Sequence, residues 1–257
     1  MKLVNFQINQ HVALVELNRP EKLNALNWDL IEDLSLCFKK LSEHKEIRCL
    51  VLYSAAAPKS FCAGADLKER LGMNEEKVVE TLDKLKDLCL LIENFPMPSI
   101  AVIDGVAFGG GLELALCCDL RIFAPHTKVA LTETSLGIIP GAGGTQRLSN
   151  LVGVARAKES IFTSQIIEAE KAANWGLCNE INKDPFLRAQ ELASNISNKG
   201  PVALRAAKKS IDGGPFLSRE DSLQWERKCY LETLETEDRR EGLKAFVEKR
   251  KPLYCGK

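Results

Sequence analysis

The chain has 257 residues, of which 45% are hydrophobic, and its 35 Lys and Arg residues are balanced by 35 Asp and Glu residues. A zero net charge argues against a sequence-independent nucleic-acid binder, which needs a basic excess to displace counterions, and gives no support for an anionic-membrane anchor. The composition is that of an ordinary globular protein, so a disordered or collagen-like chain is excluded.

The first two-thirds of the chain alternates between strand-like and helix-like segments. Short apolar runs predict strands over 3–8, 12–17, 48–54, 99–104, 120–124 and 128–131, the first two joined as a hairpin. Apolar residues at helical spacing predict helices over 27–44 and 74–94, and the run ELALCCD predicts a short buried helix over 113–119. Segments 18–26 and 55–67 are predicted loops, and 135–148 is a glycine-rich loop that enters a helix.

From residue 153 onward the pattern is almost entirely helical, apart from a strand-like stretch over 177–182. Ser218 and Asp221 have the spacing of a capping box that opens one late helix. This order of elements predicts an α/β core over 1–195 and a helical region over 196–257.

The segment FGGGLELALCCDL, residues 108–120, has the features of a reactive site. Glycines before a helix let a ligand approach the backbone, and the first N–H groups of that helix have no partner within it. Such groups can stabilise a developing oxyanion, although a tight strand–helix turn is the alternative. Glu113 lies in the first turn of this apolar helix, where an ionised carboxylate is costly unless it is paired, functional or complements the helix dipole.

Two further segments are candidates for the same site. In SFCAGADLKER, residues 60–70, Gly64 can expose the N–H of Ala65, and Lys68 and Arg70 could meet a phosphate; a surface loop is the alternative. In the segment over 131–148, Glu133 is expected at the end of a strand, ahead of a loop of packed backbone that lacks the GKS or GKT ending of a phosphate loop. Two deeply set carboxyl groups, Glu113 and Glu133, suit paired acid–base chemistry.

Five segments together resemble the crotonase (enoyl-CoA hydratase/isomerase) superfamily, in its hydratase branch. They are NRPEKLNAL, FCAGADLKER, IDGVAFGGGLELALCCDLRI, LTETSLGIIPGAGGTQRL and TEDRREGLKAFVEKRKP, and the resemblance covers essentially the whole chain. It implies an α/β spiral of ββα units with a C-terminal helical trimerisation region, and trimers that pair into a hexamer.

The resemblance also implies roles for individual residues. The N–H groups of Ala65 and Gly110 match the oxyanion hole, and Glu113 and Glu133 match the two catalytic glutamates. The residues that match the family's contacts to substrate and CoA are Ala63, Ala65, Asp66, Leu67, Lys68, Gly110, Phe246 and Lys249, the last two often reaching CoA from a neighbouring subunit. No metal and no cofactor is implied, since coenzyme A is part of the substrate.

The implied reaction adds water across the 2,3 double bond of a trans-2-enoyl-CoA to give a 3-hydroxyacyl-CoA, as in fatty-acid or branched-chain acyl-CoA degradation. The presence of both Glu113 and Glu133 favours a hydratase, because family isomerases usually keep one carboxylate at these positions. A methylglutaconyl-CoA hydratase and a Δ3,Δ2-enoyl-CoA isomerase are the alternatives. The segment 69–95 is expected to shape the acyl end of the pocket, and its apolar residues Leu71, Met73 and Leu82 allow a short or branched chain without selecting one.

The expected partners are an acyl-CoA substrate and further copies of the chain. One relative binds RNA through lysines on its first long helix, but those positions here are Trp28, Glu32 and Leu36, so no nucleic-acid partner is expected. Apolar positions at spacings that suit packing against another helix occur late in the chain, at Leu223, Tyr230, Leu231 and Leu234.

The nine cysteines are an odd number without a CxxC pair, and the three histidines lack metal-site spacing. Buried free thiols in a reducing compartment are therefore expected, with a redox or zinc role as the alternative. No apolar run approaches the ~20 residues of a membrane span, and no signal peptide is visible. The expected location is the cytoplasm of a bacterium, or the mitochondrial matrix if a leader has been removed.

Overall fold

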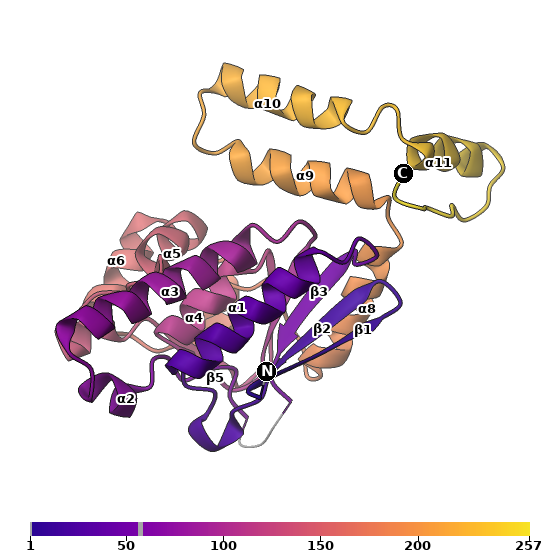
Figure 1. The fold of residues 1–257 in the computed structure, drawn as a ribbon. Coiled ribbons are helices and arrows are strands. Elements are labelled where there is room, and N and C mark those ends of the chain that lie inside the picture. The colour runs from indigo at the N-terminus through magenta and orange to yellow at the C-terminus, as the bar shows by residue number, and fades with distance from the viewer. Residues whose placement is uncertain (1, 56–58) are drawn as a thin grey trace.

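The computed structural model describes residues 2–55 and 59–257, so residues 56–58 of the predicted loop over 55–67 lie outside it. A six-stranded sheet has the order β1-β2-β3-β4-β6-β9, and all neighbours except the antiparallel β1–β2 hairpin are parallel. Figure 1 shows β1, β2 and β3 side by side. Its strands are β1 (Val4–Asn9), β2 (Val12–Leu17), β3 (Cys49–Tyr53), β4 (Ser99–Ile103), β6 (Leu120–Phe123) and β9 (Glu180–Ile181). The predicted hairpin and strands are confirmed.

Helices cover both faces of this sheet, which explains why β3 and β4 at its centre are buried at every position. In β3, Leu50 and Leu52 pack into the larger core with α1 (Trp28–Ser42), α3 (Glu75–Glu93) and α4 (Gly110–Cys117). Cys49 and Val51 face the other way and pack with α8 (Pro185–Ser197).

The predicted helix starts are confirmed by their caps. The side chain of Asn27 accepts the N–H of Leu30 at the start of α1, and Asn74 caps α3 in the same way. Ser218 accepts the N–H of Asp221 at 3.1 Å, as the capping-box spacing indicates. Each cap satisfies a backbone donor that the helix itself leaves unpaired.

A second, smaller sheet, which the sequence pattern does not predict, includes the strand that precedes Gly109, Gly110 and Gly111. It has the order β5-β7-β8, built from β5 (Val106–Phe108), β7 (Lys128–Ala130) and β8 (Ile167–Glu168), and neither β5 nor β8 was predicted. The helix predicted over 113–119 is α4, which begins at Gly110 and ends at Cys117. Glu133 was expected at a strand end, but β7 ends at Ala130 and Glu133 opens a 3-10 helix, η2 (Glu133–Leu136).

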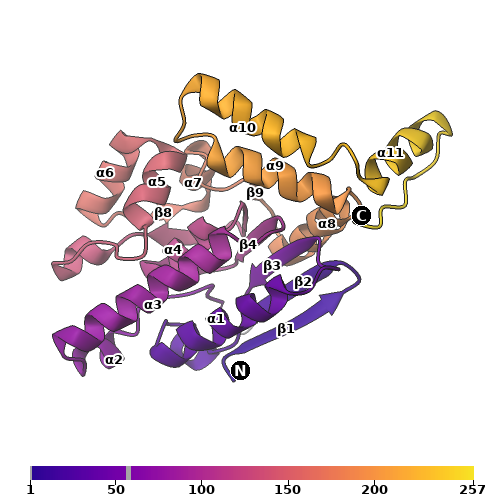
Figure 2. The ribbon, with the colours of Figure 1, turned by 45° about the horizontal axis from the view of Figure 1, so that its top comes forward.

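The remaining short elements connect these layers. They are η1 (Pro20–Lys22), α2 (Leu67–Leu71), α5 (Gly144–Val152), α6 (Val154–Thr163) and α7 (Ala169–Asn174). In Figure 2, α5, α6 and α7 lie together at one end of the molecule, beyond α4, so the glycine-rich loop before α5 lies next to the α4 helix.

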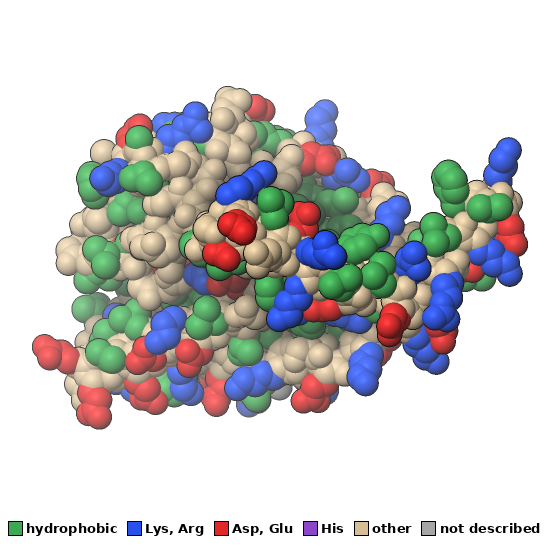
Figure 3. Space-filling model, turned by 90° about the horizontal axis from the view of Figure 1, so that it is seen from above, with side chains coloured by type: hydrophobic (Ala, Val, Ile, Leu, Met, Phe, Trp, Pro, Cys, Tyr) green, Lys and Arg blue, Asp and Glu red, His purple; other side chains and the backbone are tan. Residues whose placement is uncertain are grey.

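The C-terminal helices form an arm beside the α/β core. α9 (Pro201–Gly213) and α10 (Arg219–Leu231) pack on each other, and α11 (Glu237–Val247) projects from their far end (Figures 1 and 2). Lys208 on α9 ties the arm to the core through an ion pair of 2.9 Å with Asp119. Hydrophobic side chains gather among charged ones on this side of the molecule (Figure 3), and exposed apolar residues of the arm include Leu223, Tyr230, Leu231, Phe246 and Val247.

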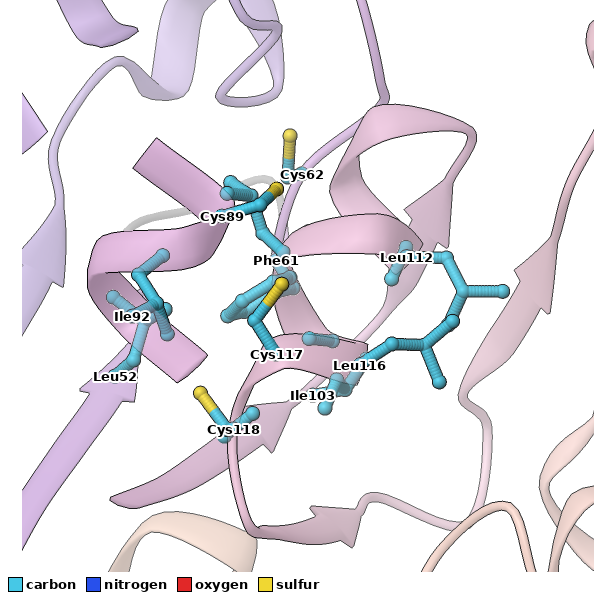
Figure 4. Close-up of a cluster of buried hydrophobic side chains, with 14 of the residues drawn as sticks. Leu52, Phe61, Cys62, Cys89, Ile92, Ile103, Leu112, Leu116, Cys117 and Cys118 are labelled. Carbon is cyan, nitrogen blue, oxygen red and sulfur yellow. The ribbon is translucent and has the colours of Figure 1, made fainter. Parts of the chain in front are cut away.

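The cysteines are free, and all except Cys255 are buried, as expected. Cys62, Cys89, Cys117 and Cys118 lie within a hydrophobic cluster with Phe61 (Figure 4). Among the described residues, no group of His, Cys, Asp and Glu side chains could hold a metal ion, and no helix is long and apolar enough to cross a membrane.

Candidate active site

Two carboxyl groups flank the Gly109–Gly110 backbone at the start of α4. A Cβ atom built on Gly109 would lie 2.9 Å from Oε1 of Glu133, and one built on Gly110 would lie 4.0 Å from Oε2 of Glu113. The structure therefore brings together the two acidic residues singled out from the sequence. A side chain at Gly109 would meet the Glu133 carboxyl group, so glycine at this position lets that carboxyl group lie against the backbone.

Glu113 is held by backbone N–H groups. The residue is only 2% exposed, yet its Oε1 atom accepts hydrogen bonds from the N–H of Ala142 at 2.8 Å and of Gly144 at 2.7 Å. Burial raises the pKa of the Glu113 carboxyl, and these two N–H groups together with nearby Arg147 oppose that rise. Hydrogen bonds to a carboxylate favour its charged form, so the contacts of Glu113 suit an oriented, ionised group.

Glu133 has a different environment. Its Oε2 atom is buried and has no hydrogen-bond partner among the residues of the described chain. Burial raises the pKa of Glu133 to about 7, its own backbone N–H opposes the rise, and the nearby Glu113 charge adds to it. Two carboxyl groups with such unlike surroundings are suited to opposite proton-transfer roles at neutral pH.

Two backbone N–H groups of neighbouring segments are available as donors. Cys62 and Ala107 form a parallel bridge, and the N–H of Phe108 donates to the Cys62 carbonyl at 3.0 Å, so the segments leading to Ala65 and Gly110 run side by side. Within the described residues, neither the Ala65 nor the Gly110 N–H has an acceptor. Free N–H groups beside a carboxyl pair form an arrangement that can bind a carbonyl oxygen.

The start of α2 is fixed by Asp66. Its carboxylate accepts the N–H groups of Lys68 and Glu69 and forms an ion pair of 2.9 Å with Arg19, which also donates to the Ala25 carbonyl. These contacts lower the pKa of Asp66 against the opposing effect of burial. The carboxylate of Asp66 is thus used within the protein, which leaves its backbone as the part able to contact a ligand.

Other residues expected at the CoA site lie around this helix start. Ala63 and Ala65 are partly buried, whereas Leu67 and Lys68 are exposed at the beginning of α2. This placement fits a binding rim in which a cationic side chain faces solvent.

The side of the site formed by α3 is apolar. A Cβ atom on Gly110 would lie 3.0 Å from Cδ1 of Leu26 and 3.5 Å from Cδ2 of Leu85, and one on Gly141 would lie 2.8 Å from Cδ2 of Leu82. Leu82 and Leu85 of the segment 69–95 thus lie against glycines around the two carboxyl groups. Leu71, in contrast, is 88% exposed.

Phe246 and Lys249 are not brought to this site. Phe246 belongs to α11 and is 84% exposed, and Lys249 follows that helix as an exposed residue. Figures 1 and 2 both show α11 on the opposite side of the molecule from α2 and α4.

Almost the whole chain matches known proteins. The sequence profile described as enoyl-CoA hydratase/isomerase matches residues 7–257. The chain belongs to this family. Mouse mitochondrial methylglutaconyl-CoA hydratase is 41% identical over 96% of this chain and 81% of its own length, and a Mycosarcoma maydis enoyl-CoA isomerase/hydratase is 44% identical over 94% and 91%.

The fold of this family member also matches solved structures. The crystal structure of enoyl-CoA hydratase from Bacillus anthracis superimposes with a TM-score of 0.97 at 43% identity, covering 99% of this chain and 100% of that one. The crotonase-like α/β fold with C-terminal helices, expected from the sequence motifs, is confirmed.

Sequence reasoning missed the groups that hold Glu113. The loop before α5 was expected only as packed backbone near the site, whereas its Ala142 and Gly144 N–H groups bind the carboxylate directly. Arg147 and Glu93 support that loop and were not singled out. The glycines of GAGGTQR are the one signal that could have indicated a close approach of backbone to another group.

Proposed function

We propose that the protein is an enoyl-CoA hydratase that adds water to a trans-2-enoyl-CoA and forms a 3-hydroxyacyl-CoA. The observation that carries this proposal is the unequal hydrogen bonding of two adjacent carboxyl groups, since Glu113 accepts two N–H bonds and Oε2 of Glu133 accepts none from the described residues. Hydration needs one group that accepts a proton from water and one that donates a proton to carbon.

In the proposed reaction, the Glu113 carboxylate takes a proton from water as the water oxygen bonds to C3 of the substrate. The electrons of the double bond move toward the thioester, whose oxygen gains negative charge and is bound by the N–H groups of Ala65 and Gly110. The protonated Glu133 then delivers its proton to C2. The sum is one water added, and the two glutamates exchange protonation states until solvent resets them.

The two N–H groups supply the electrostatic part of this catalysis. Removing one oxyanion-hole donor typically costs about 3–4 kcal/mol of transition-state stabilisation. Addition of water causes no net change in the oxidation state of the substrate, so these groups can carry out the chemistry without a redox cofactor, and we propose that no metal is needed. Coenzyme A enters as part of the substrate.

Leu26, Leu82 and Leu85 favour an uncharged, apolar acyl group at this site. Arg147, whose charge acts on Glu113, is paired with Glu93 and is therefore not free to bind a second carboxylate on the substrate. These contacts favour a simple enoyl-CoA over the dicarboxylic 3-methylglutaconyl-CoA, the substrate class named for the mouse relative.

We further propose that the arm of α9, α10 and α11 joins copies of the chain into trimers that pair as a hexamer. Leu223, Tyr230 and Leu231 of α10 support this, because these large apolar side chains are exposed in the single chain. In such an assembly, Phe246 and Lys249 of one subunit would be available to the CoA of another.

The test is a panel of acyl-CoA substrates with kcat/KM measured for each in the presence of EDTA. It includes linear 2-enoyl-CoAs from four carbons upward, 3-methylglutaconyl-CoA and a 3-enoyl-CoA. We expect hydration of the linear substrates. Conversion of the 3-enoyl-CoA without hydration would identify an isomerase, and activity lost to EDTA but restored by a divalent ion would contradict the metal-free mechanism.

A further inference from the structure

Arg147 and Glu93 lie directly behind the loop that binds Glu113. Nη1 of Arg147 donates to the Ala142 carbonyl at 2.6 Å, and its Nη2 and Nε atoms donate to the two carboxylate oxygens of Glu93 at 2.6 and 3.2 Å. The Arg147 side chain is 14% exposed, so this two-point ion pair is largely removed from solvent on the arginine side. A paired guanidinium of this kind is geometrically well defined.

The same short loop thus has two opposite contacts. Its Ala142 carbonyl accepts from Arg147, while its Ala142 and Gly144 N–H groups donate to Oε1 of Glu113. Gly143, between them, has a φ of +97°, and a Cβ atom there would lie 2.2 Å from Nη1 of Arg147. Glycine at this position leaves the space that the guanidinium occupies.

We infer that Arg147, anchored by Glu93, is a positioning residue that holds the Ala142–Gly144 peptides against Glu113 and so fixes the orientation and the ionised state of that carboxylate. The inference rests on the proposed hydratase function. Arg147 acts through the loop and touches no reacting atom. Glu93 is the last residue of α3, so the Glu93–Arg147 ion pair also links this helix, which carries Leu82, to the loop that binds Glu113.

The charged and titratable groups near Glu113 come from several elements. Glu133 approaches it from η2, Arg147 from α5, and Glu93 stands behind Arg147 at the end of α3. The thiols of Cys89 and Cys117 lie beside the same ion pair. Arg147 is the one cation in this set, so its removal favours the protonated form of Glu113.

The decisive experiment compares Arg147→Gln and Arg147→Lys with a control, Arg188→Gln. Arg188 donates to both carboxylate oxygens of Glu180 at 3.0 and 2.9 Å, which matches the Arg147 pair in kind but lies between α8 and β9, away from the site. Each variant is assayed for kcat and KM on crotonyl-CoA across pH. Hydrogen exchange is followed in the peptide that contains Ala142 and Gly144.

We expect Arg147→Gln to lower kcat by about 10- to 100-fold, as for a catalytic group displaced by a fraction of an ångström to 1 Å, with KM changed by less than about threefold. The acid limb of its kcat–pH profile moves to higher pH, and the Ala142 and Gly144 amides exchange faster. Arg147→Lys keeps the positive charge, so the acid limb of its kcat–pH profile should stay at the wild-type pH. An ammonium group lacks the planar fork that contacts both Glu93 and the Ala142 carbonyl, so only part of the wild-type kcat is expected. Arg188→Gln behaves as wild type.

A normal kcat, pH limb and exchange rate in Arg147→Gln would overturn the inference. If Arg147→Gln does not fold, Glu93→Gln replaces it, because that change removes the anchor and leaves the bond from Arg147 to Ala142. A smaller kcat loss with faster exchange of the Ala142 and Gly144 amides supports the inference, and no change in either measurement rejects it. A wild-type protein without hydratase activity would reject the proposed function separately, and the exchange measurement would still test the link between Arg147 and the loop.

Discussion

The Glu133 carboxyl group lies so close to Gly109 that no side chain fits at that position: a Cβ atom on Gly109 would lie 2.9 Å from Oε1 of Glu133. Gly109 also has a φ of +49° and caps the N-terminus of α4. The N-cap residue of the helix that bears Glu113 is therefore also the residue that leaves room for the second carboxyl group. The backbone at Gly109 thus helps to set the positions of both the Glu113 and the Glu133 carboxyl groups.

Gly109→Ala tests this relationship. The added methyl group displaces the Glu133 carboxyl, so we expect kcat to fall by about 10-fold or more. Gly153→Ala is the control, because Gly153 has a similar positive φ of +85° but nothing lies within 4 Å of a Cβ built there. Both variants are expected to lose about 1–3 kcal/mol of stability through backbone strain, and only Gly109→Ala is expected to lose activity. Equal kcat values in the two variants would contradict the assigned contact.

Glu113→Gln and Glu133→Gln test the shared proton-transfer step. Each removes one of the two groups that hydration requires, so each is expected to lower kcat by about 10²- to 10⁴-fold with little change in KM. The double variant is expected to be scarcely slower than the slower single variant, because the pair acts as a unit. Losses that add up would show that the two glutamates do not act in one step.

The stability of the protein depends on the ionisation of Glu133. Burial raises the pKa of Glu133 to about 7 in the folded protein, above the ordinary value of 4.5. Between these two values the folded state holds a proton that the unfolded state has lost, so stability falls as pH rises through this window. The contribution is fully present below about pH 4.5.

Glu133→Gln, which stays neutral at every pH, removes this dependence. We expect its melting temperature to exceed that of wild type at pH 8 and to match it at pH 4.5, measured by calorimetry or circular dichroism. The exposed Glu21→Gln is the control and leaves the difference between the two pH values unchanged. A wild-type advantage at pH 8 would mean that the Glu133 carboxylate is stabilised in the fold.

The strands and long helices could be predicted from local pattern, because apolar runs and caps such as Asn27 and Ser218 act over a few residues. The start of α4 could not, since Gly110 and Gly111 have low helix propensity and their place in a helix is set by close packing. A Cβ atom on Gly111 would lie 2.2 Å from the Cys62 carbonyl oxygen, so these two backbones touch. Sequence spacing contains no such distance.

Apolar surroundings and the family motifs were enough to pick out Glu113 and Glu133 as candidate proton-transfer groups, but the difference between their surroundings could not be predicted from the sequence. Oε1 of Glu113 accepts bonds from Ala142 and Gly144, 29 and 31 residues further along the chain. Only the folded chain shows which of the two carboxyl groups receives those donors. For the same reason Arg147, whose effect passes through the loop, is invisible to a motif search for acidic residues.

Neighbouring glycines predict opposite outcomes of mutation. At Gly110, an added Cβ meets the flexible end of Leu26, so Gly110→Ala is expected to fold and keep part of its activity, whereas Gly110→Pro loses the N–H and all turnover. At Gly111, the added atom meets the Cys62 backbone, so Gly111→Ala is expected not to fold. Circular dichroism and CoA binding separate folding from catalysis. A folded Gly110→Pro protein with a normal rate would remove the Gly110 N–H from the oxyanion hole.

The arm predicts the size of the particle in solution. Light scattering is expected to give a multiple of the 28.5 kDa chain that corresponds to a trimer or hexamer. Leu223→Lys and Leu231→Lys place charges on the exposed apolar side of α10 and should reduce that mass, while Lys228→Gln on the same helix should not. A wild-type mass near that of one chain would contradict the proposed assembly.

The buried thiols make transient opening of the core measurable by chemical labelling. Burial raises the pKa of Cys37, Cys49, Cys62 and Cys118 to about 12, so almost none of these groups is a reactive thiolate while the chain is folded. An alkylating reagent in native buffer is therefore expected to react first with Cys255, the one exposed thiol among the described residues. The slower labelling of the buried cysteines then reports how often the core opens to solvent, without the use of denaturant.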